Sequence, residues 1–390
     1  MNFLEKAQTM QAELTSLYHY FHRFPEPSHF EVETNKRIRQ ELDALSIPYL
    51  APAPNITIGI LKGGRPGKTV GLRIDTDALQ MQEDTGLPFQ SEKPGLMHGC
   101  GHDGHIAMGI TAAKMLSSVK DELSGTVKFI FQPAEEGERG AQEVIATGLV
   151  QDIDCFFGIH LWSDYPTGTL HISPGPVCAS ADMFTIRITG KGGHGAYPHL
   201  CIDAVTAGAA VVEALQHIPS RFISPMQPVV VTVGCFHAGT RCNIIAQEAE
   251  LRGTLRTFDN AVCTEVHQLL ERLTKQTAAA HGCTAEVEIY KACSVVVNDA
   301  ALCASAVKSA EKLMNKENIS TQSPSMVGDD FAEYGALGPA VYAQLGIGSA
   351  EKGTCYAHHH GKFKLDEEML PLGAALFCQF AYDACEESTN

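Results

Sequence analysis

Short runs of apolar residues alternate with stretches of helical periodicity along most of this chain. Residues 56–61, 69–74 and 125–131 are predicted strands, and residues 106–119, which separate the last two of these, are a predicted helix. A further apolar run, 155–160, is expected to continue the same sheet. Strands that alternate with helices indicate an α/β fold, in which helices cover a central, mixed and largely parallel sheet.

The pattern changes near Ser180. Residues 181–292 predict the order strand, helix, strand, strand, helix, strand, which is that of a ferredoxin-like α+β sandwich. Because α/β sequence flanks this segment on both sides, we interpret it as a domain inserted into a first domain made of residues 1–180 and 293–390. Two domains also agree with the length of 390 residues, which exceeds the size at which single cores stop growing.

Charge and cysteine content limit the partners of the chain. The formal net charge of −16 argues against a nucleic acid or an anionic membrane, because both need a basic surface. No stretch approaches the roughly 20 apolar residues of a membrane span, and the N-terminus lacks the apolar run of a secretory signal. The 13 cysteines are scattered and favour a reducing compartment. We therefore expect a cytoplasmic protein whose partner is neither a nucleic acid nor a membrane.

The segment MHGCGHDGH, residues 97–105, contains the first candidate metal ligands. Cys100 and His102 are two residues apart, so in an extended or loop backbone their side chains emerge on the same side. The glycines of this segment, Gly99, Gly101 and Gly104, allow the backbone to approach an ion closely. A predicted helix follows, and crevices at strand ends are where open α/β sheets bind ligands. The alternative is that Cys100 is a small buried hydrophobe and the histidines only pack or cap.

Three further segments place ligand-type residues after predicted strands. Glu135 and Glu136 follow the strand 125–131, His160 ends the apolar run 155–160, and the loop GTCYAHHHGKF follows a strand near residue 345. Taken alone, two adjacent glutamates indicate a solvated turn, and three consecutive histidines indicate an exposed one. Together these segments favour a metal site. One carboxylate would bind metal, and the other would act as general base toward a metal-activated water.

The chain resembles the metal-dependent family of amidohydrolases and peptidases that contains aminoacylases and carboxypeptidase G2. Within this family it is most similar to the branch of hippurate hydrolases, N-acyl-amino-acid amidohydrolases and indole-acetyl-amino-acid hydrolases. The resemblance spans nearly the full length, and together its motifs are highly specific. They are HRFPEPSHFEVET, GLRIDTDAL, MHGCGHDGH, FQPAEEG, GIHLW, GKGGHGAYPH, GTRCNII, LRGTLRTF and HHHGKFKLDEE.

The resemblance implies a site for two divalent metal ions, with zinc as the first expectation and manganese or cobalt as alternatives. It implies that Glu135 is the general base and that Cys100 bridges the metals. His359 is the expected ligand of its loop because it lies four residues before Phe363, although His358 and His360 are competing candidates. The implied ligands are Cys100, His102, Glu136, His160 and His359.

The inserted domain resembles the lid of this family, which often mediates dimerisation, so a homodimer is expected. The resemblance implies that His194 stabilises the oxyanion, frequently in the active site of the partner subunit. It also associates Asn243 and Arg256 with binding of the substrate, although Asn243 could cap a turn and Arg256 could be a strand surface residue. Asp75 is expected to orient a ligand imidazole. Asp103 is expected either to do the same or to cap the helix that follows it.

The implied function is hydrolysis of the amide bond of an N-acyl amino acid or a related small amide. The alternative within the family is a dipeptidase or carboxypeptidase that uses the same two-metal centre. A binding protein that only senses a metabolite would not need to keep Glu135. A structural zinc protein would use closely spaced sets of four ligands, whereas these ligands are dispersed along the chain.

Overall fold

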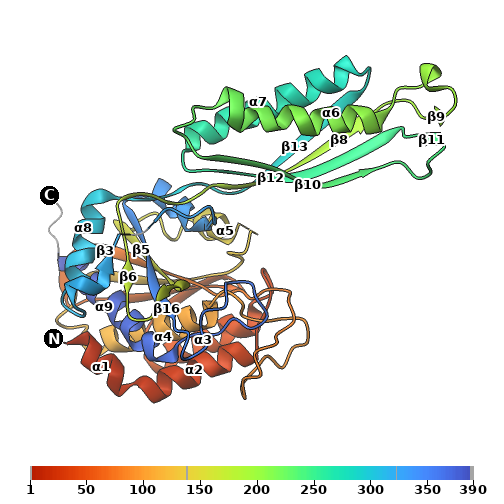
Figure 1. Cartoon of the computed structure of the whole chain (residues 1–390). Coiled ribbons are helices and arrows are strands. Elements are labelled where there is room, and N and C mark those ends of the chain that lie inside the picture. Colours follow the sequence, from red (N-terminus) through yellow and green to blue (C-terminus); the bar gives the residue numbers. More distant parts are fainter. Residues whose placement is uncertain (1, 138, 322, 387–390) are drawn as a thin grey trace. The chain divides into compact units, whose positions relative to one another are not determined.

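The apolar strands assemble into two separate sheets, each with its own core, in the computed structural model shown in Figure 1. The model describes residues 2–137, 139–321 and 323–386. The chain divides into two compact units. The first unit consists of Met1–Val177, Val297–Ser323 and Asp330–Asn390, and the second of Cys178–Val296 and Pro324–Asp329.

The first unit contains an eight-stranded mixed sheet with the order β1-β2-β4-β3-β5-β16-β6-β15. The neighbours β4, β3, β5 and β16 run parallel, whereas β1 and β2 join one side in antiparallel fashion and β6 is antiparallel to β16. The prediction of an α/β protein with a large mixed sheet is therefore confirmed. The strands are β1 (Tyr49–Ala53), β2 (Ile56–Lys62), β3 (Arg65–Asp75), β4 (Ser124–Gln132), β5 (Cys155–Pro166), β6 (Leu170–His171), β15 (Ile319–Ser320) and β16 (Ala340–Gly348).

Helices cover this sheet, and two of them are buried along nearly their whole length. Helix α9 packs against α4 and against β3 and β4, while α2 packs against both α4 and α9. Both α4 and α9 are apolar almost all round, which is the pattern of a helix inside a core. The helices of the first unit are α1 (Phe3–Thr9), α2 (Gln11–Arg23), α3 (Val32–Ala44), α4 (His102–Ser117), α5 (Gly140–Ala146), α8 (Ala300–Ala310) and α9 (Leu370–Glu386).

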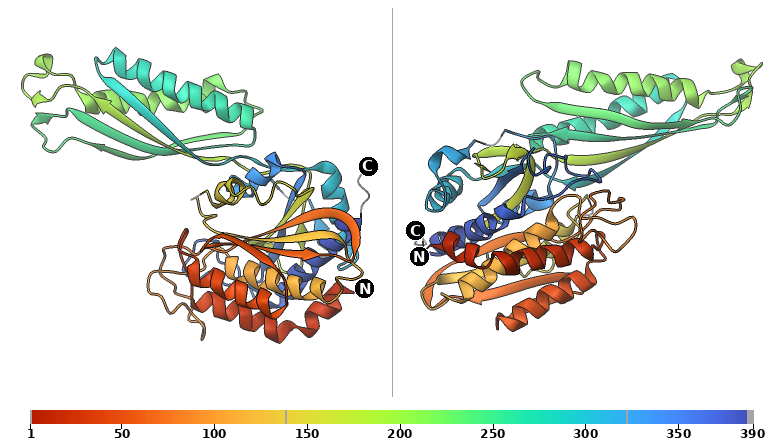
Figure 2. Two further views of the ribbon diagram at one scale, coloured as in Figure 1. Left: turned by 180° about the vertical axis from the view of Figure 1, so that it is seen from behind. Right: turned by 60° about the horizontal axis from the view of Figure 1, so that its bottom comes forward.

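The second unit contains a four-stranded antiparallel sheet with the order β10-β12-β8-β13. Two helices lie along one face of this sheet, as both views of Figure 2 show. Along β8 buried and less buried side chains alternate, so that Phe184, Ile186 and Ile188 enter the core beneath these helices. The elements are β8 (Ala181–Thr189), α6 (Ala204–His217), β10 (Val229–Ala238), β12 (Glu248–Thr257), α7 (Asn260–Ala280) and β13 (Thr284–Cys293).

Short elements complete the described chain. Two-stranded sheets are formed by β9 (Gly193–His194) with β11 (Ile244–Ile245), and by β7 (Gly175–Cys178) with β14 (Val296–Asn298). Short 3₁₀ or π segments are η1 (Pro198–Leu200), η2 (Ile218–Phe222), η3 (Lys316–Asn318), η4 (Asp330–Ala336) and η5 (Glu367–Met369). Among the described residues, the longest apolar helices fall short of what is needed to cross a membrane.

One predicted strand end differs from the structure in a way that affects the site. The apolar run 155–160 predicts a strand that ends at His160, but β5 continues to Pro166. His160 therefore lies inside the strand, where it is paired with Gln344 of the parallel strand β16. The strand continues because its pairing with β16 extends past His160 to Trp162 and, after an irregularity, to Pro166.

Candidate metal centre

A glycine-rich loop turns directly into helix α4 and carries two of the predicted ligands. Gly101 has φ +90°, a left-handed conformation that favours glycine, and precedes the first helical residue, His102. The predicted helix 106–119 thus begins earlier than expected, and His102 stands on its first turn rather than in a loop. Cys100 lies just before this turn. Both side chains therefore sit at the N-terminal end of α4, where the helix dipole favours an anionic group such as a thiolate.

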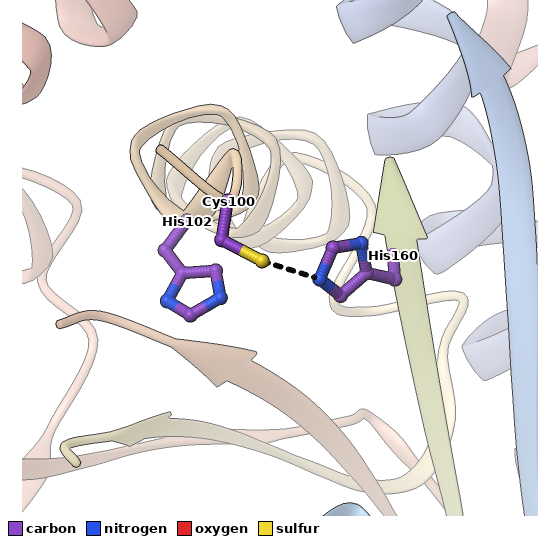
Figure 3. Close-up of side chains that lie close together, drawn as sticks. All are labelled: Cys100, His102 and His160. Carbon is purple, nitrogen blue, oxygen red and sulfur yellow. Dashed lines mark hydrogen bonds between the residues drawn. The ribbon is translucent and has the colours of Figure 1, made fainter. Parts of the chain in front are cut away.

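Strand β5 brings His160 to this helix end, as Figure 3 shows. Sγ of Cys100 lies 3.5 Å from Nε2 of His160. The other ring nitrogen of His160 donates to the carbonyl of Leu161 at 2.9 Å, which leaves Nε2 to face the thiol. The ligand atoms of Cys100, His102 and His160 all lie within 4.8 Å of one another.

A second set of ligand atoms adjoins the first through the same thiol. Glu136 follows β4, and its Oε2 lies 3.3 Å from Nε2 of His359. The ligand atoms of Cys100, Glu136 and His359 again lie within 4.8 Å of one another. The backbone N–H of His359 donates to the carbonyl of Gly99 at 2.9 Å, so the histidine loop is tied to the glycine-rich loop. Cys100 is thus the residue common to both sets.

The two histidines that flank His359 point elsewhere. His358 is held by a hydrogen bond from its Nε2 to the carbonyl of Leu161, at 2.9 Å. His360 is exposed, stacks on Tyr356, and accepts at Nδ1 from a backbone N–H. Of these three histidines, the structure places only His359 against Glu136.

The carboxylate pair does not form a solvated turn. Glu135 is only 8% exposed, and the Glu136 side chain is only 11% exposed. Oε2 of Glu135 and Oε1 of Glu136 each lie 3.9 Å from Nε2 of His102. The two glutamates therefore enter the same cluster from one loop. This arrangement suits one carboxylate that binds a cation and another that faces a reacting molecule.

Asp77 is the residue that the sequence reasoning missed. Its carbonyl accepts from Nδ1 of His102 at 2.9 Å, and its Oδ1 lies 3.3 Å from the same nitrogen. Its Oδ2 accepts from the hydroxyl of Ser28 at 2.7 Å and from the backbone N–H of Glu136 at 3.2 Å. Asp77 thereby orients two predicted ligands at once. The available signal was its position in GLRIDTDAL, two residues after Asp75 and thus on the same side of an extended chain.

Asp75 orients a different imidazole from the one expected. Its Oδ1 accepts from Nδ1 of His105 at 2.5 Å, whereas its Oδ2 lies 3.6 Å from Nε2 of His102. Nε2 of His105 in turn accepts from the backbone N–H of Leu161 at 3.0 Å. Asp75 therefore acts on the site through His105 and the backbone beside His160.

Asp103 bonds no predicted ligand, but its Oδ1 accepts from the backbone N–H of Gly104 in the first turn of α4 at 2.8 Å, as expected of a residue that caps this helix. It is the second residue of α4, and its Oδ2 accepts from Nδ1 of His22 at 2.6 Å. Nε2 of His22 lies 3.1 Å from Glu83. Burial opposes the charged imidazolium, but the two carboxylates outweigh it and raise the pKa of His22 to about 9. Asp103 thus fixes helix α2 to the start of α4.

A buried carboxylate also supports the loop that carries the glutamates. Ala134 has φ +52°, which is strained for a residue with a side chain, and its N–H donates to Oε1 of Glu31 at 2.8 Å. Burial and the nearby Asp77 raise the pKa of Glu31 to about 8. Nothing in the local sequence around Glu31 indicated this contact.

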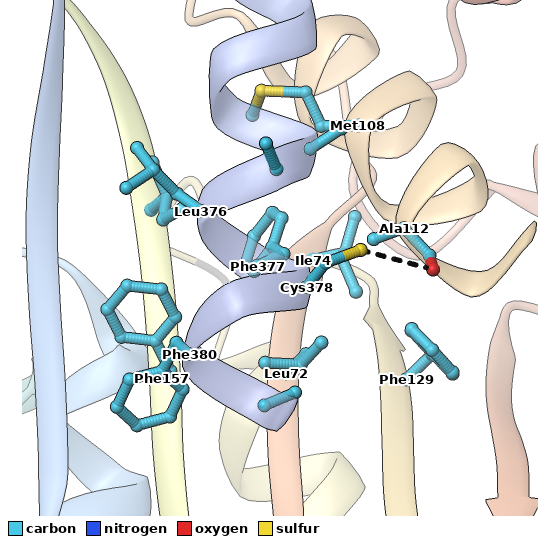
Figure 4. Packing of buried hydrophobic residues seen from close by; sticks show 14 of the residues in the cluster. Leu72, Ile74, Met108, Ala112, Phe129, Phe157, Leu376, Phe377, Cys378 and Phe380 are labelled. Carbon is cyan, nitrogen blue, oxygen red and sulfur yellow. Dashed lines mark hydrogen bonds between the residues drawn. The ribbon is translucent and has the colours of Figure 1, made fainter. Parts of the chain in front are cut away.

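Helix α4 is held in place by the core of the first unit (Figure 4). The sulfur of Met108 on α4 packs so closely against Gly373 of α9 that any side chain at this glycine would collide with it. On the sheet side of α9, Phe380 stacks on Phe157 of β5 with ring centroids 4.2 Å apart. The elements that carry His102 and His160 therefore share one close-packed core, which fixes their spacing.

The residues expected in the inserted domain lie in the second unit. His194 and Asn243 adjoin each other, because Ile244 pairs with His194 and the carbonyl of Asn243 accepts from Gly195. Strand β12 begins at Glu248, which pairs with Thr189 at the end of β8, and the chain continues from there to His194. Arg256 lies near the other end of β12. Within one chain, Arg256 is thus apart from the other two.

The electrostatics of the cluster fit a bound cation. Burial and the carboxylates of Glu136 and Glu135 raise the pKa of the Cys100 thiol well above its usual range. Among the described residues, buried Nε2 of His102 and buried Oε1 of Glu136 have no hydrogen-bond partner. Divalent cations would satisfy these atoms, offset the carboxylates and favour the thiolate. Metal ions therefore fit the residues present.

Comparisons with known proteins agree with this geometry. Residues 71–383 match the sequence profile described as Peptidase family M20/M25/M40. The N-acetylcysteine deacetylase of Bacillus subtilis (strain 168) is 37% identical over 377 residues, covering 96% of this chain and 97% of the relative. Thermostable carboxypeptidase 1 of Saccharolobus solfataricus is 36% identical over 358 residues, covering 90% of each chain.

A solved structure extends the likeness to the fold. The crystal structure of the Bacillus subtilis YXEP protein, described as a dinuclear metal binding peptidase from the M20 family, superposes with a TM-score of 0.85 at 34% identity. The match covers 97% of this chain and 99% of that chain.

Replacing Asp77 by Asn is expected to weaken metal binding by about 10- to 100-fold, because the variant loses the carboxylate that orients His102 and Glu136. The measurement is the dissociation constant for zinc by competition with a chromophoric chelator. Asp84→Asn is the control, since the Asp84 side chain is 78% exposed. An affinity of Asp77→Asn equal to that of Asp84→Asn would contradict the role of Asp77.

Proposed function

Because the chain belongs to peptidase family M20/M25/M40 and is a metal-dependent hydrolase, we propose that it cleaves the amide bond of small N-acyl amino acids. The observation that carries the proposal is the buried carboxylate of Glu135 beside the ligand atoms of His102 and Glu136. A buried carboxylate next to cation ligands can take and return the proton that amide hydrolysis must move.

The proposed cofactor is a pair of divalent metal ions, held by the two sets of ligand atoms that share Cys100. When bound, such ions lower the pKa of water and polarise a carbonyl. A thiolate ligand favours zinc, whereas the imidazoles and the carboxylate also admit manganese or cobalt. The description of the Bacillus subtilis YXEP protein as dinuclear supports the count of two. The proposed ligands are Cys100, His102, Glu136, His160 and His359.

Glu135 is the proposed general base and then the general acid. Its carboxylate accepts a proton from the attacking water and donates it to the leaving amine, without which an amide is a very poor leaving group. Asp77 keeps the imidazole of His102 and the backbone of Glu136 in place. The oxyanion of the tetrahedral intermediate would be stabilised by a donor such as His194.

Two relatives of nearly equal similarity point to different substrates. One is named a deacetylase of an N-acylated amino acid, and the other a carboxypeptidase. The dipeptidase or carboxypeptidase reading therefore stays as the second candidate. It requires recognition of a free α-amine, whereas the first requires room for an acyl group. Parallel assays on an N-acetyl amino acid and on the unblocked dipeptide separate the two.

The second unit is proposed to act as a lid and to join two subunits. Its strand β10 lies at an edge of the sheet and is largely exposed, and exposed edge strands are usually covered. Large exposed hydrophobic side chains are also concentrated in this unit, among them Met226 at 86% exposure and Leu200 at 61%. In the homodimer, His194, Asn243 and Arg256 are proposed to contact the substrate.

A cytoplasmic location is proposed from the 13 scattered cysteines, which suit a reducing compartment.

Replacing Glu135 by Gln is expected to abolish turnover while leaving the metal content unchanged, because the amide keeps the shape but not the basicity. The loss should exceed about 100-fold in kcat, the lower range for general acid–base catalysis. The measurements are kcat on an N-acetyl amino acid and metal content by elemental analysis. Glu143→Gln, which changes a half-exposed glutamate on α5, is the matched control. A Glu135→Gln variant with normal kcat would remove Glu135 from this role.

Mixing two inactive variants tests whether His194 acts across the dimer. Glu135→Gln and His194→Ala should each be inactive alone, but hybrid dimers should regain activity because one site then has both intact residues. The measurement is activity after mild dissociation and reassociation of the two variants. A mixture of Glu135→Gln with His199→Ala serves as the control for assembly. A mixture as inactive as its parts, with hybrid dimers detected by mass spectrometry, would place His194 in the site of its own chain.

A further inference from the structure

A second group of metal-ligating side chains lies entirely within the second unit. Oδ2 of Asp182 lies 2.5 Å from Nε2 of His267 and 3.0 Å from Sγ of Cys263. Sγ of Cys263 and Nε2 of His267 are 3.5 Å apart. All three ligand atoms lie within 4.8 Å of one another. The function proposed above uses none of these residues.

The secondary structure fixes this group from two elements. Cys263 and His267 are four residues apart on α7, so their side chains lie one above the other on one face of the helix. Asp182 is the second residue of β8 and shares its inward face with Phe184, which packs in the core. The register is set on both sides, since Asp182 pairs with Leu255 and with Lys291. A carboxylate is thus held beneath a helix that presents a thiol and an imidazole.

The carboxylate of Asp182 is incompletely satisfied. Asp182 is 0% exposed, and its Oδ1 has no hydrogen-bond partner among the described residues. Its Oδ2 accepts hydrogen bonds from both Cys263 and His267. Buried polar atoms are nearly always paired, and a buried charge is costly without a cation or several donors. The lack of a partner for Oδ1 of Asp182 therefore indicates that a ligand binds beside these three residues.

We propose that Asp182, Cys263 and His267 bind a divalent cation of the zinc type, at a site separate from the Cys100 centre. Thiolate, imidazole and carboxylate are the three donor types that zinc takes in proteins, and three protein ligands leave a fourth position for water or a hydroxyl. The side chain of His267 is 24% exposed, which gives the ion a path from solvent.

Binding has a defined proton balance. The thiol proton of Cys263 leaves to solvent, and the hydrogen that Nε2 of His267 donates to Asp182 moves to Nδ1 by exchange with solvent, so that the neutral ring binds the ion through Nε2. The ion then replaces two hydrogen bonds with three bonds to one centre that spans α7 and β8. Because the ion binds only the folded unit, it stabilises the packing of this helix on the sheet.

The first test counts metal ions in the zinc-loaded protein by elemental analysis after gel filtration. Cys263→Ala should contain one zinc equivalent per chain fewer than wild type. Cys283→Ala, which removes another buried thiol of the same unit, should match wild type. Equal zinc content in wild type and in both variants would overturn the proposal, because the group is then a hydrogen-bonded trio only.

The second test is spectroscopic and does not depend on the count. Cobalt bound to a thiolate shows a charge-transfer band in the near ultraviolet, so we would load cobalt into a Cys100→Ser variant, whose metal centre lacks its thiolate. The proposal expects the band to remain there and to disappear when Cys263→Ala is added, but not when Cys283→Ala is added. A band that is absent from Cys100→Ser, or that survives in Cys100→Ser with Cys263→Ala, would overturn it. If the Cys100→Ser variant does not fold, the zinc count on Cys263→Ala decides.

Discussion

The concentration of buried carboxylates beside one thiol is the constraint on which the rest of the structure depends. Asp75, Asp77, Glu135 and Glu136 all lie around His102. Burial opposes the imidazolium, yet Asp75 and Asp77 outweigh it and raise the pKa of His102 to about 10. Arg73 pairs with Asp75, yet one guanidinium and one imidazolium leave the four carboxylates with excess negative charge, which bound cations would offset. Metal binding and folding of these loops are therefore coupled.

The sheet explains why distant residues meet at this place. Strands β3 and β4 run parallel and end together, since Asp75 pairs with Gln132, and the segments with Asp77 and Glu136 follow at the same edge. The helix that begins at His102 is buried against α9 and the sheet, so its N-terminal end cannot shift without disturbing the core. Side chains carried on such rigid elements keep the spacing that a metal site requires.

Part of this arrangement could be predicted from the sequence and part could not. Motifs that border predicted strands or helices predict that the segments with Cys100, Glu136 and the three histidines meet, whereas the choice of His359 among these histidines came from the family resemblance. The start of α4 at His102 depends on the left-handed Gly101, which a periodicity of apolar residues does not reveal. The contacts of Asp77 depend on tertiary structure, because the residues that it orients lie 25 and 59 positions away. The Asp182 group was missed for the same reason, since 81 positions separate Asp182 from Cys263.

The central claim is that two cations lie side by side at the Cys100 centre, and X-ray absorption at the zinc edge tests it most directly. The zinc-loaded Cys263→Ala variant is suited to this measurement, because a sulfur ligand in it would be that of Cys100. The account predicts a sulfur neighbour at about 2.3 Å and a metal–metal distance of about 3.5–4 Å. A shell of nitrogen and oxygen alone, with no second metal within that range, would contradict it.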